Sequence, residues 1–285
     1  MRFTSLLFSL AACALPGLAS AASNAPSLLV PAYFYPEAAG ATEWARLTAA
    51  ASQVSVTAII NPDSGAGSAY DPTYAQAVID FKSAGGKVLG YVSTNWGQRD
   101  LQAVKSEIDN YANWYPVDGL FFDESGENAS ELGYFTTVTN YARQSNPGAT
   151  LIANPGTVPN EAYMALFNSV VIYENPASKL SAYVPPAYLT KYSADHFGML
   201  VLNGSKAVME QQVAFAASNN LGYVYVNDRP VRADEWSALP AYWEAEVAAV
   251  KLLSAVPEPE QYAMLLAGLG LVAGAARRQR AKTHG

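Results

Sequence analysis

The chain has 285 residues, enough for one large domain or two small ones, and it is 51% hydrophobic but only 14% charged. Residues 22–255 carry 12 basic and 22 acidic side chains, a net charge of −10. This balance argues against nucleic acid as a partner, because binding it requires basic side chains that neutralise phosphates. Cys13 is the only cysteine, so the chain beyond the N-terminal segment has no disulfide, thiol nucleophile or cysteine-based zinc site.

The first 21 residues have the pattern of a secretory signal peptide. Arg2 precedes an apolar run over residues 6–18, and Ala19-Ser20-Ala21 forms a small-x-small cleavage pattern. The alternative is a lipoprotein box that ends at Cys13, which would leave an unusually short signal. We therefore predict export, with cleavage by signal peptidase after Ala21.

Short apolar runs alternate with amphipathic helical patterns between residues 28 and 253. Strands are predicted over residues 28–35, 54–60, 87–93, 118–122, 150–153, 169–173, 197–202 and 222–226. Helices are predicted over residues 42–51, 72–84, 100–114, 131–144, 161–167, 206–218 and 241–253, and Pro185-Pro186 break any long helix over 178–191. This alternation favours an α/β fold, a (β/α)8 TIM barrel, as a single domain over residues 22–255. A doubly wound sheet is the alternative, although no Gly-rich phosphate fingerprint follows the first strand.

The C-terminal ends of the strands are where a barrel of this kind places its active site. The stretch 118–124 is an apolar strand that ends in two adjacent carboxylates, Asp123 and Glu124, and the sixth strand ends near Glu174. Two carboxylates suit glycosidic cleavage, because one protonates the leaving oxygen while the other attacks or activates water. Candidate substrate-binding residues at the strand ends are Tyr33, Asn61, Tyr91, Trp96, Arg99, Asn154, Tyr173 and Tyr225. With only two histidines in the chain, we expect neither a Ser-His-Asp site nor a metal, and no cofactor.

Several of these candidates have a structural explanation as well. Asn61 and Asn154 precede prolines, so turn formation alone would account for them. Arg99 would equally hold its loop by pairing with an acid. The fourth and sixth strands lie about 10 Å apart between backbones, and inward-leaning side chains would reduce that to the roughly 5 Å of a retaining pair. An inverting separation fits the same arithmetic.

Motifs at six strand ends follow one another in a characteristic order. They are Tyr33-Phe34-Tyr35-Pro36, the stretches 60–67, 90–99 and 118–124 together with Trp114-Tyr115, Asn154-Pro155-Gly156-Thr157, and Tyr173-Glu174. Together they resemble the spherulin 4 (spherulation-specific family 4) proteins over residues 28–228. The resemblance implies a TIM-barrel glycoside hydrolase of family 135, near family 114, whose members cleave α-1,4-linked galactosamine or N-acetylgalactosamine polymers. It also implies Asp123 as nucleophile, Glu174 as acid/base and Glu124 as a third acidic neighbour, with the order of the two acids on the fourth strand open to exchange.

Residues 256–285 contain three elements in order. Val256-Pro257-Glu258-Pro259 is followed by an apolar stretch over 262–276 and the basic cluster Arg277-Arg278-Gln279-Arg280. The arrangement resembles the PEP-CTERM sorting signal recognised by an exosortase, and a plain C-terminal membrane anchor is the alternative. The resemblance implies a Gram-negative, exopolysaccharide-producing bacterium. It also implies transient inner-membrane anchoring and a final location at the cell surface or in the extracellular (biofilm) matrix.

The sequence thus predicts an exported, endo-acting glycoside hydrolase for an amino-sugar exopolysaccharide. The net negative charge suits a partly deacetylated, cationic polymer. The alternative is a non-catalytic matrix or surface protein that uses a hydrolase scaffold to bind polysaccharide.

Overall fold

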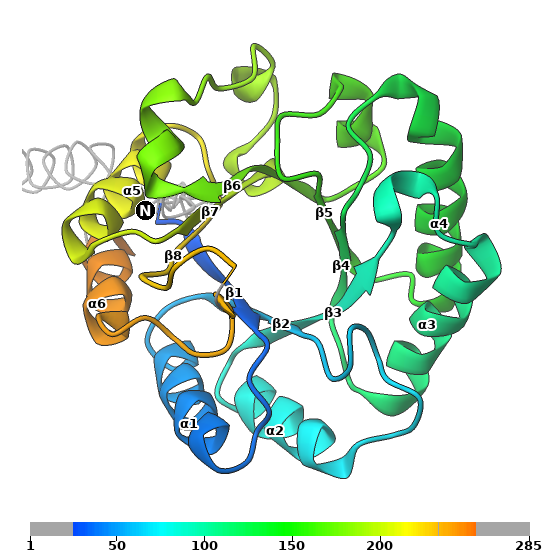
Figure 1. Ribbon diagram of the computed structural model, residues 1–285, viewed down its shortest axis with the longest axis horizontal. Coiled ribbons are helices and arrows are strands. Elements are labelled where there is room, and N and C mark those ends of the chain that lie inside the picture. The colour runs from blue at the N-terminus through cyan, green and yellow to red at the C-terminus, as the bar shows by residue number, and fades with distance from the viewer. Residues whose placement is uncertain (1–24, 233, 255–285) are drawn as a thin grey trace, which may run out of the picture. The chain divides into compact units, whose positions relative to one another are not determined.

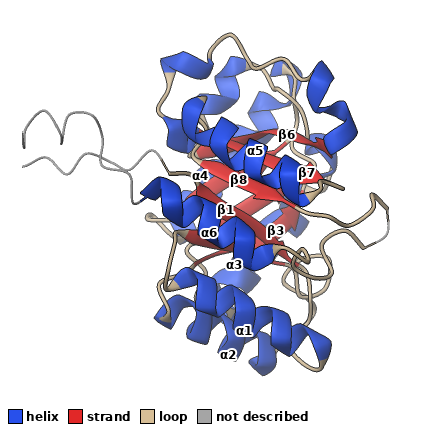
Figure 2. Ribbon diagram, turned by 90° about the vertical axis from the view of Figure 1, so that its left-hand side faces the viewer, coloured by secondary structure: helices blue, strands red, loops and turns tan. Residues whose placement is uncertain are grey.

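Eight parallel strands close into a barrel in which each strand is hydrogen-bonded to the next in chain order and β8 pairs with β1 (Figure 1). The computed structural model describes residues 25–232 and 234–254. Helices surround the strands on the outside of the barrel (Figure 2). This architecture is a TIM barrel and confirms the predicted fold class. The predicted signal peptide and C-terminal sorting segment lie outside the described residues.

The strands and helices alternate along the chain, with short 3-10 turns in place of helices after β5 and β6. The strands are β1 (Ser27–Ala32), β2 (Val56–Ile60), β3 (Lys87–Ser93), β4 (Gly119–Asp123), β5 (Thr150–Asn154), β6 (Ser169–Pro176), β7 (Phe197–Leu202) and β8 (Tyr223–Val226). The helices are α1 (Ala39–Ala51), α2 (Pro72–Ser83), α3 (Leu101–Trp114), α4 (Leu132–Ser145), α5 (Lys206–Ser218) and α6 (Trp243–Ser254). None of these helices is long and apolar enough to span a lipid bilayer.

Two boundaries differ from the prediction in ways that affect the strand ends. β1 ends at Ala32, so Tyr33 and Tyr35 belong to the β1–α1 connection and not to the strand. β6 runs on to Pro176 after an irregularity between Val171 and Tyr173, which shifts its register against β7. The helix predicted over 161–167 is a 3-10 turn, Glu161–Ala165, and the stretch around Pro185-Pro186 likewise holds only 3-10 turns, as proline in a helix interior would require.

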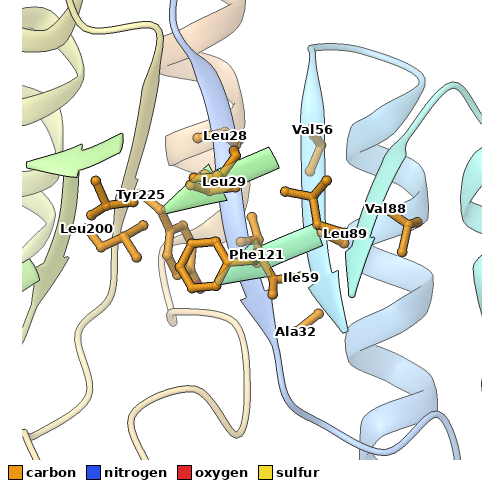
Figure 3. Close-up of a cluster of buried hydrophobic side chains, with 14 of the residues drawn as sticks. Leu28, Leu29, Ala32, Val56, Ile59, Val88, Leu89, Phe121, Leu200 and Tyr225 are labelled. Carbon is orange, nitrogen blue, oxygen red and sulfur yellow. The ribbon is translucent and has the colours of Figure 1, made fainter. Parts of the chain in front are cut away.

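Apolar side chains from all eight strands fill the barrel interior beneath the strand ends. The register pairs Ile59 with Leu89 and Leu200 with Tyr225, and paired residues of parallel neighbours point to the same face. Figure 3 shows these side chains with Phe121 inside the barrel, where each is 1% exposed or less. The interior is therefore a packed core, and polar chemistry is confined to the layer at the C-terminal ends of the strands.

Gly119, the first residue of β4, approaches the backbone of β5 closely. A Cβ at this position would lie 1.9 Å from the carbonyl oxygen of Thr150. Gly119→Ala is therefore expected to lower the free energy of unfolding by about 3 kcal/mol or more, because a backbone atom has to move. Gly133→Ala on α4 is the matched control, since no atom lies within 4 Å of its Cβ and alanine favours helix. Urea unfolding of both variants measures the difference, and equal effects would contradict the argument.

Candidate active site

Asp123, the last residue of β4, lies between β3 and β5 at the mouth of the barrel. The register pairs it with Ser93 of β3 and Asn154 of β5. Its Oδ1 accepts a hydrogen bond from Asn154 Nδ2 at 2.7 Å, and its Oδ2 accepts one from Tyr91 Oη at 2.9 Å. Both oxygens are therefore held by donors, which fix the orientation of the carboxylate and favour its ionised form.

Asn154 joins Asp123 to the carboxylate of Glu174 on β6. The same Nδ2 that donates to Asp123 also donates to Glu174 Oε2. Its Oδ1 accepts from the backbone N–H of Gly156 at 3.1 Å, which determines which way the amide faces. Two oxygens bound to one amide nitrogen lie within about 5 Å of each other, because each hydrogen bond spans less than about 3 Å and the two N–H bonds diverge by about 120°. The structure thus brings together the two acids that the sequence singles out from β4 and β6.

The pKa values of the two carboxyl groups are shifted by burial, by charge and by hydrogen bonds. Removal from solvent, with a further contribution from the charge of Asp123, raises the pKa of Glu174 to about 7. Burial also raises the pKa of Asp123, but hydrogen bonds from Tyr91 and Asn154 oppose this rise. The two sites titrate as a pair, because each charge acts on the other. Near neutral pH, Glu174 is therefore suited to carry a proton beside an ionised Asp123.

Glu124 follows Asp123 directly but has other partners. Ser93 Oγ donates to its Oε2 at 2.7 Å. Its φ of 50° lies in the left-handed region, which a residue with a Cβ seldom adopts. Its carbonyl oxygen accepts from the backbone N–H of Trp96 at 2.6 Å and from Thr94 Oγ1 at 2.8 Å, and these bonds hold the unusual conformation in place. Glu124 is thus a fixed third acid at the mouth, outside the bridge that Asn154 makes.

Aromatic side chains lie beside the carboxylates and on the rim. The rings of Tyr33 and Tyr91 meet edge to face with centroids 5.6 Å apart. Burial and the nearby charge of Asp123 raise the pKa of Tyr33, so its phenol stays protonated as a donor. Trp96, in the β3–α3 loop, is 50% exposed with a φ of 51°. Tyr33 and Tyr91 therefore adjoin Asp123, whereas Trp96 presents its indole to solvent.

Arg99 and Asn61 make contacts within the loops. The guanidinium of Arg99 forms an ion pair with Glu107 of α3 and donates to the carbonyl oxygen of Ser93 at 2.8 Å. Asn61 Oδ1 accepts from the backbone N–H of Gly65 at 2.6 Å, closing the turn after β2. Both side chains thus hold backbone that surrounds the mouth, and neither has a hydrogen bond to Asp123 or Glu174.

Tyr173 and Tyr225, the remaining predicted site residues, are buried. Tyr173 is 4% exposed and donates to the carbonyl oxygen of Pro176 at 2.8 Å, away from the carboxylates. Tyr225 is 1% exposed and packs against Trp236, with ring centroids 6.0 Å apart. The structure therefore places both rings where they support the mouth and leaves them little surface for contact with a ligand.

The β8–α6 loop contributes a carboxylate that the sequence analysis did not select. The charge of Glu235 is one of the causes that raise the pKa of Glu174. The backbone carbonyl of Glu235 accepts from Asn227 Nδ2 at the end of β8, which anchors this loop. Ser93, the partner of Glu124, was missed too; its position at the end of β3 was the available signal. Within residues 25–232 and 234–254, no cluster of histidine and acidic side chains has the arrangement of a metal site.

Comparison with known proteins identifies the family of the chain. Residues 27–250 match the family described as spherulation-specific family 4. Spherulin-4 of Physarum polycephalum is 34% identical over 252 residues, covering 82% of this chain and 73% of the relative. The chain belongs to the spherulation-specific family 4. The family resemblance in the strand-end motifs is thereby confirmed.

Solved structures share the fold of this spherulin 4 protein. Sph3 of Aspergillus clavatus, crystallised in complex with GalNAc, superposes with a TM-score of 0.70 at 21% identity, over 79% of this chain and 97% of that chain. Active domain 2 of a thermostable chitinase from Pyrococcus furiosus, in complex with chito-oligosaccharides, gives a TM-score of 0.52 at 13% identity, over 81% and 96%. At these identities the likeness establishes the barrel fold.

The C-terminal segment matches a second family. Residues 255–281 match the PEP-CTERM protein-sorting motif, which confirms the resemblance noted for this part of the sequence. The motif indicates that the chain is exported and processed by an exosortase in a Gram-negative bacterium.

The raised pKa of Glu174 makes protein stability depend on pH. In the unfolded chain this carboxyl ionises near its ordinary value of 4.5, and in the folded chain at about 7. The stability that Glu174 contributes is therefore full below pH 4.5 and is lost as the pH rises through 7. Glu174→Gln, which is neutral throughout, is expected to raise the free energy of unfolding by about 1–3 kcal/mol at pH 8 and by less at pH 5.

Urea unfolding at both pH values measures this effect. The control is Glu210→Gln on the exposed face of α5, where a change of less than about 0.5 kcal/mol is expected at either pH. A Glu174→Gln protein that gains no more stability at pH 8 than at pH 5 would show that Glu174 ionises freely in the fold.

Proposed function

We propose that this protein is an exported glycoside hydrolase that cleaves within an α-1,4-linked galactosamine/N-acetylgalactosamine exopolysaccharide by a retaining mechanism. Asp123 is the nucleophile, Glu174 is the acid/base, and Glu124 is an acidic neighbour. The observation that carries this proposal is the Asn154 amide that bridges Asp123 and Glu174. A carboxylate pair within about 5 Å suits a retaining reaction, because an inverting pair lies about 6.5–9.5 Å apart to accommodate a water.

In the first half of the reaction, protonated Glu174 donates its proton to the glycosidic oxygen. The Asp123 carboxylate attacks the anomeric carbon as the bond to that oxygen breaks, which gives a covalent glycosyl–enzyme ester. The pKa of Glu174, about 7, keeps the proton available at neutral pH. Tyr91 and Asn154 hold Asp123 in the orientation that attack requires.

In the second half, water replaces the departed sugar. Glu174, now a carboxylate, accepts a proton from this water while the water oxygen attacks the anomeric carbon and releases Asp123. Two displacements at one carbon restore the original anomeric configuration. The product is a new reducing end, and both carboxyl groups return to their starting protonation.

Two observations support an amino-sugar polymer as the substrate. Sph3, which shares the fold, was crystallised with GalNAc. The net charge of −10 over residues 22–255 and the acidic side chains Asp123, Glu124 and Glu235 around the mouth would attract a polymer that carries free amines.

The same proposal assigns the ends of the chain to processing. Residues 1–21 are a signal peptide removed by signal peptidase, residues 22–255 are the catalytic domain, and residues 256–285 anchor the chain in the inner membrane until an exosortase acts. The protein then resides at the cell surface or in the extracellular matrix. The matched sorting motif supports this route.

The proposal is tested by the release of reducing ends from a panel of exopolysaccharides that includes α-1,4-linked N-acetylgalactosamine polymer before and after deacetylation. We expect cleavage of this polymer with an α-configured first product, which NMR detects before mutarotation. Cleavage of the deacetylated form should be faster at low salt and should lose this advantage as salt screens the charges.

Two results would count against these claims. Polymer binding without any new reducing ends would indicate a non-catalytic polysaccharide-binding protein on a hydrolase scaffold. Faster cleavage of the acetylated chain at every salt concentration would refute the preference for a cationic polymer.

A further inference from the structure

An open groove lined by tyrosines runs beside the β2–α2 loop, outside the carboxylate site. Its volume is about 480 Å³, and its lining includes Tyr35, Tyr70, Tyr115 and Asp63. Tyr35 is 44% exposed and Tyr70 is 53% exposed, which is unusual for large aromatic rings on a protein surface. Exposed aromatic rings gathered around a concave surface indicate a binding site.

The loop that carries this groove is held by neighbouring elements at several points. The backbone N–H of Ala66 donates to Glu107 Oε1 at 3.2 Å, and that of Asp71 donates to Tyr115 Oη at 3.3 Å. Asn61 closes the start of the same loop through Gly65. These anchors fix a segment of eleven residues between β2 and α2 that has no regular secondary structure.

The tyrosine rings are also oriented by their neighbours. Tyr70 stacks on Tyr115 with centroids 6.2 Å apart and an interplanar angle of 28°. Tyr35 meets Tyr74 of α2 edge to face at 5.4 Å. Binding of a ligand that stacks on the exposed faces of Tyr35 and Tyr70 therefore costs little side-chain entropy, because both rings are already ordered.

The chemistry of the lining favours a saccharide. Asp63 is exposed and no lysine or arginine lines the groove, so a polyanion would be repelled. The tyrosine faces offer apolar surface to the C–H face of a sugar ring, while the carboxylate and backbone groups accept hydrogen bonds from hydroxyl or amino groups. A neutral or amine-bearing sugar fits both properties.

The β1–α1 connection carries both a residue of the carboxylate site, Tyr33, and a residue of the groove lining, Tyr35. Tyr33 packs against Tyr91, which donates to Asp123, and Tyr35 follows only two residues later. Two residues of chain span at most about 7 Å, roughly the length of one sugar ring. A polymer chain held at Asp123 can thus continue over Tyr35 towards Tyr70.

We propose that this tyrosine groove binds sugar units of the substrate polymer several positions away from the cleaved bond. The proposal rests on the proposed function for the identity of the polymer. It assigns to Tyr35 and Tyr70 the task of retaining long chains, which raises the efficiency of cleavage for polymer relative to short oligosaccharides.

The test compares wild type with Tyr35→Ala and Tyr70→Ala. Two values of kcat/KM are measured for each protein, one on α-1,4-linked galactosamine polymer and one on its short oligosaccharides. The ratio of polymer to oligosaccharide efficiency is expected to fall about threefold to tenfold in each alanine variant, mainly through KM. Tyr70→Phe keeps the ring and should keep the wild-type ratio. If the hydroxyl of Tyr70 made the contact instead of the ring, the ratio would fall in this variant as well. Ile79→Ala, on α2 with 47% exposure and outside the groove lining, should keep it as well.

The possible outcomes separate this proposal from the proposed function. Cleavage of polymer by wild type with an unchanged ratio in both alanine variants would overturn the groove and leave the hydrolase intact. Polymer binding that depends on Tyr35 and Tyr70, without cleavage, would support the groove and reject the hydrolase. A wild-type protein that neither binds nor cleaves the polymer would overturn both. A ratio that falls equally in Ile79→Ala would also overturn the groove.

Discussion

Asp123→Asn and Glu174→Gln are each expected to lower kcat for polymer cleavage by about 10³-fold or more, with the fold intact. Asn cannot supply the negative charge that attacks the anomeric carbon, and Gln cannot donate a proton to the leaving oxygen. Both replacements preserve shape and one acceptor oxygen, so the Asn154 bridge keeps its partners. Reducing-end assays together with circular dichroism measure the loss and check the fold.

The roles of the two acids are separated by rescue with azide. In Asp123→Ala, azide would occupy the space of the lost carboxylate and displace the leaving group once, which inverts the anomeric configuration. In Glu174→Ala, azide would attack the glycosyl–enzyme ester after Asp123 has reacted, which retains it. The opposite pattern would exchange the two roles.

Glu124→Gln is the control within the same strand end. Because Glu124 bonds to Ser93 and not to Asn154, we expect a smaller loss of kcat than in Asp123→Asn. A larger loss would show that the two adjacent acids have exchanged functions.

The fold could be predicted from the sequence because each buried strand is short, apolar and ended by a turn residue. Phe121-Phe122-Asp123 shows the pattern: two core side chains are followed at once by the first residue that faces the mouth. A parallel barrel brings all such strand ends to one side, so the sequence alone also pointed to Asp123 or Glu124 as a neighbour of Glu174.

The contacts of individual side chains could not be obtained in the same way. Tyr173 adjoins Glu174 in sequence, yet alternation along β6 and the register shift direct its ring to Pro176. Tyr225 points into the barrel, but one layer of side chains below the mouth. The alternation of residues along a strand predicts which side chains point inward, but not how far below the mouth each one lies. Both positions depend on register, which only the assembled sheet determines.

Arg99 illustrates a further limit. Its partner Glu107 lies on α3 within an amphipathic pattern, where a carboxylate normally faces water. Here Glu107 is buried, and its two oxygens bind Arg99 and the backbone of Ala66. This contact joins two loops that are distant in sequence, so no local sequence pattern predicts it.

Asn154→Ala is expected to lower kcat/KM by about 10²-fold and to shift the pH profile to higher pH. The Asn154 amide stabilises the ionised forms of both carboxyl groups and thus lowers the pKa of each. Its removal raises both values, so the acidic limb, set by ionisation of Asp123, and the basic limb, set by deprotonation of Glu174, move in the same direction. The loss of rate follows from the loss of a fixed donor that holds Asp123 in place for attack.

A purely structural role for Asn154 would give a different result. The alanine variant would then lose stability through the Gly156 turn, where Asn154 Oδ1 accepts a hydrogen bond, and keep the wild-type pH profile. Asn154→Asp separates the two roles, because it keeps an acceptor for Gly156 but places a third carboxylate between Asp123 and Glu174. That variant should retain the turn, raise the pKa of Glu174 further and lose activity. An unshifted profile in Asn154→Ala would mean that the two carboxyl groups set their own proton affinities without the bridge.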